Sequence, residues 1–150
     1  MKPTLRPATE SDFAFAFEAK KEAMGPHISA RWGWDENYQL AVHRRRWTEK
    51  PWFIISLNGM SIGTVSILEE PNSLRFGEFY LLTRFQHQGL GSMILSQVLE
   101  GCDKSNKAVR LEYLKWNPVG SLYKRHGFKV VSENDIHYFM VREPHSRYPL

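Results

Sequence analysis

The segment from Leu74 to Lys115 constrains the fold more than any other, because it predicts two strands joined by a helix. Residues 74–82 are rich in aromatic and large apolar side chains and are predicted to form a strand. A helix is predicted from Gly89 to Gly101, where apolar residues recur at spacings of three and four. Residues 108–115 form the second predicted strand. Two strands joined through a helix lie parallel in one sheet, so the chain is expected to contain a sheet with helices against it.

The rest of the chain adds antiparallel strands and further helices. Asn58-Gly59 separates two strand-like runs and is typical of a two-residue hairpin turn. Five further strands are expected, at residues 4–7, 52–57, 61–68, 128–131 and 136–142. Three further helices are expected, from Thr9 to a break at Gly25-Pro26, from Asp35 to about Trp47, and from Pro118 to Arg125. The element order is β-α-α-β-β-β-α-β-α-β-β, which predicts a single α/β domain over residues 1–150, with an α+β-like mixed sheet and a loosely held tail at 144–150.

Composition excludes several classes of protein. The single cysteine, Cys102, rules out a disulfide within the chain and favours a reducing compartment. No apolar run approaches the ~20 residues that span a bilayer, and the N-terminus has no signal-peptide core. A cytoplasmic protein without a membrane partner is therefore expected.

The charged and metal-ligating residues point to neither nucleic acid nor metal. The formal net charge is +4, and the densest basic run is Arg44-Arg45-Arg46. Nucleic-acid-binding domains have a larger basic surface, so no nucleic-acid partner is expected. The run is interpreted as a solvated helix face, with steering of an anionic cofactor as the alternative. The six histidines show no metal-ligand spacing, so no metal is expected.

The turn Gln86-His87-Gln88-Gly89-Leu90-Gly91 lies directly between a predicted strand and a predicted helix. Two glycines allow the backbone to approach a ligand closely, and the first amides of the helix are unpaired and partly positive. The turn is therefore a candidate pyrophosphate site, and the alternative is an ordinary strand-to-helix turn. Neither the Walker-type loop nor the dinucleotide fingerprint is present.

Two motifs resemble those of the GNAT superfamily of N-acetyltransferases. The first, Leu81 to Leu95, resembles its acetyl-CoA motif, Gln/Arg-x-x-Gly-x-Gly/Ala after a strand. The second, Asn117 to Phe128, resembles its Asn, Leu-Tyr and Gly-Phe signature. Thr83 stands where proline is frequent in the family, and His87 where glycine is frequent. The predicted element order also resembles a GNAT domain.

The resemblance implies acetyl-CoA as cosubstrate, with no metal. It implies pyrophosphate contacts from the backbone of His87 to Ser92 and pantetheine contacts near Leu81 and from Asn117. The alternative role for Asn117 is an N-cap of the following helix. The implied cofactor-binding residues are Leu81, Gln86, His87, Gln88, Gly89, Leu90, Gly91, Ser92, Asn117 and Tyr123.

Acetyl transfer to an amine needs a neutral amine, a donor for the oxyanion, and a proton or hydrogen bond for the departing thiolate. The resemblance places Tyr123 beside the thioester sulfur as general acid, and the alternative is a core tyrosine. Glu78 is the preferred general base and Glu112 the second choice, while either could be a solvated or ion-paired strand residue. Cys102 is expected to be a structural thiol.

The acceptor residues are predicted from the cluster Trp32 to Glu36, where GNAT enzymes have a substrate-facing loop. Trp32, Trp34 and Glu36 are candidates to hold a cationic amine, together with His137. The alternative is that the tryptophans pack the second helix on the sheet and that Asp35 caps it. The expected acceptor is a small-molecule amine; a protein acceptor and a non-catalytic acetyl-CoA-binding module are the alternatives. The protein is expected to be a monomer or a homodimer.

Overall fold

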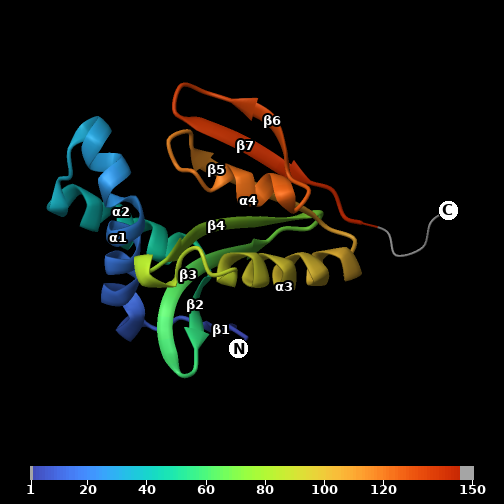
Figure 1. The fold of residues 1–150 in the computed structure, drawn as a ribbon, viewed down its shortest axis with the longest axis horizontal. Coiled ribbons are helices and arrows are strands. Elements are labelled where there is room, and N and C mark those ends of the chain that lie inside the picture. Colours follow the sequence, from blue (N-terminus) through green and yellow to red (C-terminus); the bar gives the residue numbers. More distant parts are fainter. Residues whose placement is uncertain (1, 146–150) are drawn as a thin grey trace.

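Residues 2–145 are described by the computed structural model, and they form one seven-stranded sheet with helices around it (Figure 1). The strand order across the sheet is β1-β2-β3-β4-β5-β7-β6. The strands are β1 (Thr4–Pro7), β2 (Trp52–Leu57), β3 (Met60–Glu69), β4 (Ser73–Leu81), β5 (Ala108–Leu114), β6 (Lys129–Glu133) and β7 (His137–Arg142). The α-helices are α1 (Phe13–Trp32), α2 (Glu36–Glu49), α3 (Leu90–Lys104) and α4 (Gly120–Arg125). Most of the tail predicted at 144–150 lies outside the described residues.

The predicted mixed sheet and element order are confirmed. The strands β4 and β5, which α3 connects, are parallel. Every other strand pair within residues 2–145 is antiparallel. The strand-helix-strand segment therefore contains the one parallel strand pair of this sheet within residues 2–145, as expected for two strands joined through a helix.

The prediction that Gly25-Pro26 ends the first helix was wrong, because α1 continues to Trp32 with Pro26 inside it. A proline within a helix removes one backbone hydrogen bond and costs about 3 kcal/mol. Met24 and Ile28, on either side of this proline, are both buried. Burial of this apolar face favours continuing the helix, and it outweighs the local preference for a break.

The short helix α4 begins at Gly120, two residues after the predicted start at Pro118. The Asn117 side chain accepts a hydrogen bond from the Val119 amide at 3.1 Å, which closes a turn ahead of the helix. Asn117 therefore acts on the backbone just before α4 rather than as its N-cap, a position that Val119 occupies.

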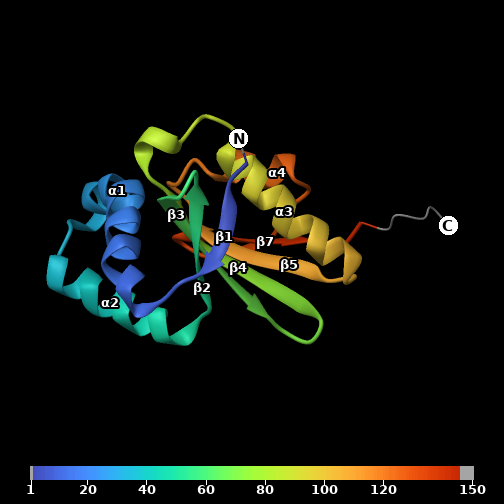
Figure 2. The same ribbon diagram turned by 90° about the horizontal axis from the view of Figure 1, so that it is seen from below.

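The helices form two groups on opposite sides of the sheet. Figure 2 shows α1 beside α2 at one side and α3 beside α4 at the other. The face below α3 and α4 holds the main core, where Leu90, Ile94 and Leu95 of α3 are buried with Phe76 of β4 and Val109 of β5. Several buried polar residues, Lys20, His43 and Glu78, lie on the side toward α1 and α2.

Candidate active site

A cleft opens where β4 and β5 separate. The two strands pair only between Ser73–Arg75 and Ala108–Arg110, although β4 continues to Leu81 and β5 to Leu114. A cleft of about 950 Å³ is lined by both strands, by α1 and α2, and by β6 and β7. The facing backbone edges beyond the paired residues have no strand partner, so a bound molecule can supply the missing hydrogen bonds.

A β-bulge turns Glu78 toward α2. Ser66 of β3 pairs with Gly77 and Thr64 pairs with Tyr80, so two residues of β4 lie opposite one residue of β3. Glu78 has a φ of 47°, in the left-handed region that such residues seldom adopt. The Thr64 hydroxyl donates a hydrogen bond to the Glu78 carbonyl at 2.9 Å, which holds the bulge in place.

Basic side chains surround the Glu78 carboxylate. Lys50 lies 3.1 Å and Arg46 3.6 Å from its Oε1 atom, and the Tyr80 hydroxyl donates to Oε2 at 3.3 Å. Burial raises the pKa of Glu78, but the charges of Lys50, Lys20 and Arg46 and the Lys50 hydrogen bond lower it, and the pKa lies below its usual value. Glu78 is therefore ionised at neutral pH.

Glu112, the second predicted base, lies on β5 and lines the same cleft. Its side chain is exposed, and within residues 2–145 it makes no ion pair. The two glutamates thus differ in surroundings, because Glu78 is buried among cations and Glu112 is solvated. Both can accept a proton within the cleft.

Tyr123 of α4 is 5% exposed and also lines the cleft. Its ring contacts those of Phe76, Tyr113 and Phe128, with centroids 5.6 to 6.3 Å apart. Burial raises the pKa of Tyr123 well above its ordinary value, so the phenol is protonated. The hydroxyl makes no hydrogen bond to any residue in the described range, which leaves it free to donate to a bound molecule.

The predicted phosphate loop has unpaired amides. The amides of His87, Gln88 and Gly89 make no hydrogen bond within residues 2–145, and the first amides of α3 follow directly. His87 has a φ of 60° and Gly89 a φ of 79°. The left-handed conformation explains the glycine at 89, whereas His87 adopts it without being glycine. The Gln86 side chain donates to the Leu81 carbonyl at 2.9 Å and so ties the loop to the end of β4.

Ser92, in the first turn of α3, is hydrogen-bonded to His126 after α4, with 2.8 Å between Oγ and Nε2. This contact joins the start of α3 to the end of α4, two segments that the sequence motifs had indicated separately. Asn117 reaches the other side, where its Nδ2 atom lies 3.5 Å from the Met24 sulfur of α1.

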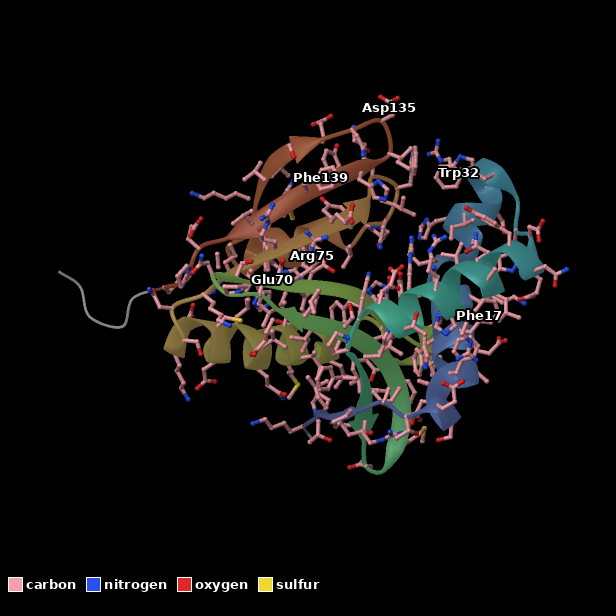
Figure 3. The ribbon with its side chains drawn as sticks, turned by 180° about the vertical axis from the view of Figure 1, so that it is seen from behind. Phe17, Trp32, Glu70, Arg75, Asp135 and Phe139 are labelled. Atoms are coloured by element: carbon pink, nitrogen blue, oxygen red, sulfur yellow. The ribbon has the colours of Figure 1, made fainter. Side chains whose placement is uncertain are left out.

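The predicted acceptor residues fall into two groups. Trp32 and His137 line the cleft, and Figure 3 shows Trp32 and Asp135 at the facing rims formed by α1 and the β6–β7 turn. Trp34 and Glu36 do not line it. The Trp34 ring lies 6.2 Å from that of Phe17, and Glu36 pairs with an α1 lysine at 2.6 Å.

The α1–α2 connection agrees in part with the alternative interpretation of this cluster, in which a tryptophan packs against a helix and Asp35 caps α2. Asp35 caps α2 by accepting a hydrogen bond from the Tyr38 amide at 3.0 Å. The Trp34 ring packs against α1 rather than facing the cleft. A role of Trp34 or Glu36 in binding an acceptor stays a prediction without a structural contact behind it.

The basic run separates into three ion pairs. Arg44 pairs with Glu10 at 2.6 Å, Arg45 with Glu49 at 3.9 Å, and Arg46 with Glu78. Two of the three side chains lie on the solvated surface of α2, and only Arg46 reaches the cleft.

Residues 2–145 contain neither a candidate membrane-spanning helix nor a candidate metal-binding group. No helix in this range is both long and apolar enough to span a membrane. No group of three or more histidine, cysteine, aspartate or glutamate side chains there is arranged to hold a metal ion.

Sequence reasoning missed Lys20, which is 5% exposed and lines the cleft from α1. The signal was present, because Ala16, Lys20 and Met24 are four residues apart and so share one helix face. A lysine on an otherwise apolar face is an unusual buried cation. Nothing in the sequence indicated that Lys20 lies close enough to Glu78, on a distant strand, for the two charges to act on each other.

Known proteins match both the sequence and the fold. The family model of the acetyltransferase (GNAT) domain matches residues 48–130, more than half of the chain. The PaiA N-acetyltransferase of Thermoplasma acidophilum, solved in complex with coenzyme A, is 18% identical with a TM-score of 0.76, over 95% of this chain and 99% of that one. No curated protein sequence matches the chain.

Two further solved structures share the fold. The ribosomal-protein-S18-alanine N-acetyltransferase of Escherichia coli is 16% identical with a TM-score of 0.71, over 98% of this chain and 96% of that one. The putative acetyltransferase yncA of Salmonella typhimurium, solved with acetyl-CoA, is 20% identical with a TM-score of 0.64, over 100% and 98%. At these identities the likeness is one of fold.

Proposed function

Because the chain belongs to the GNAT acetyltransferase family, we propose that it transfers the acetyl group of acetyl-CoA to the primary amine of a small molecule. The observation on which this depends is the separation of β4 from β5, with Tyr123 and two glutamates lining the cleft that results. Relatives of the same fold are solved with coenzyme A and with acetyl-CoA, which supports the choice of cosubstrate.

The loop before α3 and the edges of the parted strands are the proposed site for acetyl-CoA. The free amides from His87 to Gly89 and the first turn of α3, with Leu90, Gly91 and Ser92, suit a pyrophosphate group. The unpaired edge of β4 near Leu81 suits an amide-bearing arm such as pantetheine, as does Asn117. Gln86 would act by holding the loop against the end of β4.

The proposed chemistry is direct attack by the acceptor. Glu78 takes a proton from the ammonium group, directly or through a water molecule, and the neutral nitrogen attacks the thioester carbonyl. The C–N bond forms and the C–S bond breaks, the Tyr123 hydroxyl donates its proton to the departing sulfur, and the proton lost from the newly bonded nitrogen restores the Tyr123 hydroxyl. Burial raises the pKa of Tyr123, which keeps the phenol protonated as a hydrogen-bond donor to the sulfur but makes full proton transfer less favourable. Glu112 is the alternative base.

The size of the cleft favours a small acceptor. Its volume of about 950 Å³ falls within the range of ~300–1,000 Å³ that is usual for small-molecule sites. Trp32 of α1 and His137 of β7 both line the cleft, which supports their proposed contact with the acceptor. A protein acceptor would need an open groove in the same place. A cytoplasmic location and a monomeric or dimeric state stay predictions from the sequence.

The test is a free-thiol assay with acetyl-CoA and a panel of amines, amino acids, amino sugars and peptides. Tyr123→Phe is the matched variant, because it removes one hydroxyl and leaves the ring contacts. We expect wild-type turnover of at least one small amine, and a loss of about 10²- to 10⁴-fold in rate for the variant with unchanged binding of coenzyme A. Binding of coenzyme A without turnover of any member would favour a non-catalytic module, and turnover of peptides alone would favour a protein acceptor.

A wild-type rate in the Tyr123→Phe protein would assign this tyrosine to the core only. Joint loss of coenzyme A binding and rate would make it a residue that positions the cosubstrate. Calorimetry with coenzyme A separates the two results.

A further inference from the structure

Lys20 is a buried cation without a direct partner. Only 5% of the residue is exposed, and that small exposed part borders the cleft. Within residues 2–145 it makes no hydrogen bond and no ion pair. Burial lowers its pKa to about 8, and Glu78 acts against this shift. Burial of an ammonium group is unfavourable unless an opposite charge or hydrogen-bond acceptor compensates it.

The charges nearest Lys20 do not balance. Lys20, Arg46 and Lys50 surround one carboxylate, that of Glu78. Lys50, Arg46 and the Tyr80 hydroxyl already occupy the oxygens of that carboxylate. Three cations against one anion leave an excess of two positive charges at the inner end of the cleft.

Other charged groups of the cleft do not remove this excess. Glu49 lies on the exposed side of α2 and pairs with Arg45 at 3.9 Å. Asp35 lies at the start of α2, eleven residues before Arg46, and it is not among the charges that shift the pKa of Lys20. Glu112 lies across the cleft on β5. The exposed Arg110, two residues earlier, is on the same face of that strand. His43, behind Lys20, is kept neutral by burial, which lowers its pKa.

We propose that the acceptor amine carries an anionic group, a carboxylate or a phosphate, that binds the Lys20 ammonium. The inference rests on the proposed function and names its substrate class. An acceptor whose anion is a few atoms from its nitrogen places the anion beside the Lys20 ammonium and its own ammonium group beside the Glu78 carboxylate. A polyamine or another purely cationic acceptor meets repulsion at the same point.

The experiment uses pairs of acceptors that differ only in the anion. Tyrosine is compared with tyramine, 4-aminobutyrate with 4-aminobutyramide, and glucosamine 6-phosphate with glucosamine. The first pairs test a carboxylate and the last tests a phosphate. For wild-type protein we expect the anionic member of at least one pair to have a kcat/KM about 10- to 100-fold higher, which corresponds to one charge-assisted contact.

Lys20→Met is the variant, since it keeps the length of the side chain and removes its charge. We expect the ratio of kcat/KM between the two members of the pair to fall toward one, and this ratio within one protein is the readout, because loss of the Lys20 charge also changes the surroundings of Glu78. Lys104→Met, an exposed lysine on α3, is the control and should keep the preference. The melting temperature of Lys20→Met should equal or exceed that of the wild type, because a buried, unpaired charge has been removed.

The outcomes separate this inference from the proposed function. Equal or higher rates with the members that lack the anion, or a preference that survives in Lys20→Met, would overturn it. If no amine is acetylated, the proposed function fails, and the inference is decided by binding. In that case, the melting temperature is measured with coenzyme A and the same anionic amines. An increase that is absent in Lys20→Met supports the anion site at Lys20, and no increase overturns it.

Discussion

At the scale of single residues, the charges around Glu78 determine what it can do as a base. Its neighbours lower its pKa against the effect of burial, so the carboxylate is ionised at neutral pH. An ionised carboxylate can accept a proton at once, although a low pKa also makes it a weak base. The limiting quantity is then the fraction of acceptor amine that is neutral.

Glu78→Gln should lower kcat/KM by about 10²- to 10⁴-fold at pH 6 and 7, and by less at pH 9. At high pH the amine is already neutral and needs no base, so raising the pH restores part of the rate. The measurement is the pH profile of kcat/KM for Glu78→Gln beside that of Glu112→Gln. A pH-dependent loss in the Glu112 variant alone would move the role of base to Glu112.

Folding must be checked in the same samples, because Glu78→Gln leaves Lys20, Arg46 and Lys50 without their carboxylate. Coenzyme A affinity is the readout that a base does not affect. A variant that keeps this affinity and loses rate in the expected pH range supports the role in proton transfer. A uniform loss at every pH would instead indicate that Glu78 positions its neighbours.

At the scale of elements, the junction between β1 and α1 depends on Asp12. Its carboxylate accepts two hydrogen bonds from Arg6, each 2.9 Å long, and one of 2.8 Å from the Thr9 amide. Thr9 and Asp12 form a capping box at the start of the short 3₁₀ helix Glu10–Asp12 that leads into α1. The Arg6 hydrogen bond, against burial, lowers the pKa of Asp12 to about 2.

Asp12→Asn should lower the free energy of unfolding at pH 7 by about 1 to 2 kcal/mol, allowing for the solvent exposure of Arg6. The folded pKa lies below the ordinary value, so the stabilisation is complete above about pH 4 and is lost as the pH falls toward 2. Urea unfolding at pH 7 and pH 3 measures the difference between the two proteins. It should shrink at pH 3, and an equal difference at both pH values would contradict the assignment.

The same scale shows what the sequence could predict. The type and order of the elements followed from apolar spacing, from Asn58-Gly59 and from the glycine turn before α3, because these signals are local. The continuation of α1 past Pro26 was not predictable in this way, since it depends on burial of Met24 and Ile28 by strands far along the chain. The bulge at Glu78 had one local signal, Gly77 within a strand.

The candidate active site also has a part that local sequence signals predict and a part that depends on long-range packing. The motif residues of the loop and of α4 were recognised because each motif is continuous in sequence. The roles of Lys20, Arg46 and Lys50 depend on the packing of α1 and the end of α2 next to β4. No local sequence pattern predicts this packing. For the same reason, Trp34 and Glu36 looked like cleft residues in the sequence, although their side chains turn toward α1.

At the scale of the whole molecule, the gap between β4 and β5 divides the sheet into two parts. The strands β1 to β4 lie on one side of it, and β5, β7 and β6 on the other, with three paired positions joining the two. The helix α3 and the contact between Ser92 and His126 also cross from one part to the other. A molecule bound in the gap would contact both parts and so stabilise the native fold as a unit.

Coenzyme A should therefore raise the melting temperature, with a gain of about 2.7 kcal/mol at a concentration 100-fold above its dissociation constant. Gly89→Glu should abolish this gain, because it puts bulk and negative charge beside the free amides of the loop. The matched control is Gly101→Glu at the other end of α3, where a side chain meets open space. Since glutamate at a φ of 79° is itself strained, the quantity to compare is the shift within each protein rather than the melting temperature. A shift that persists in Gly89→Glu would place the pyrophosphate elsewhere, whereas a shift lost in both variants would mean that added negative charge on α3 weakens binding without regard to position.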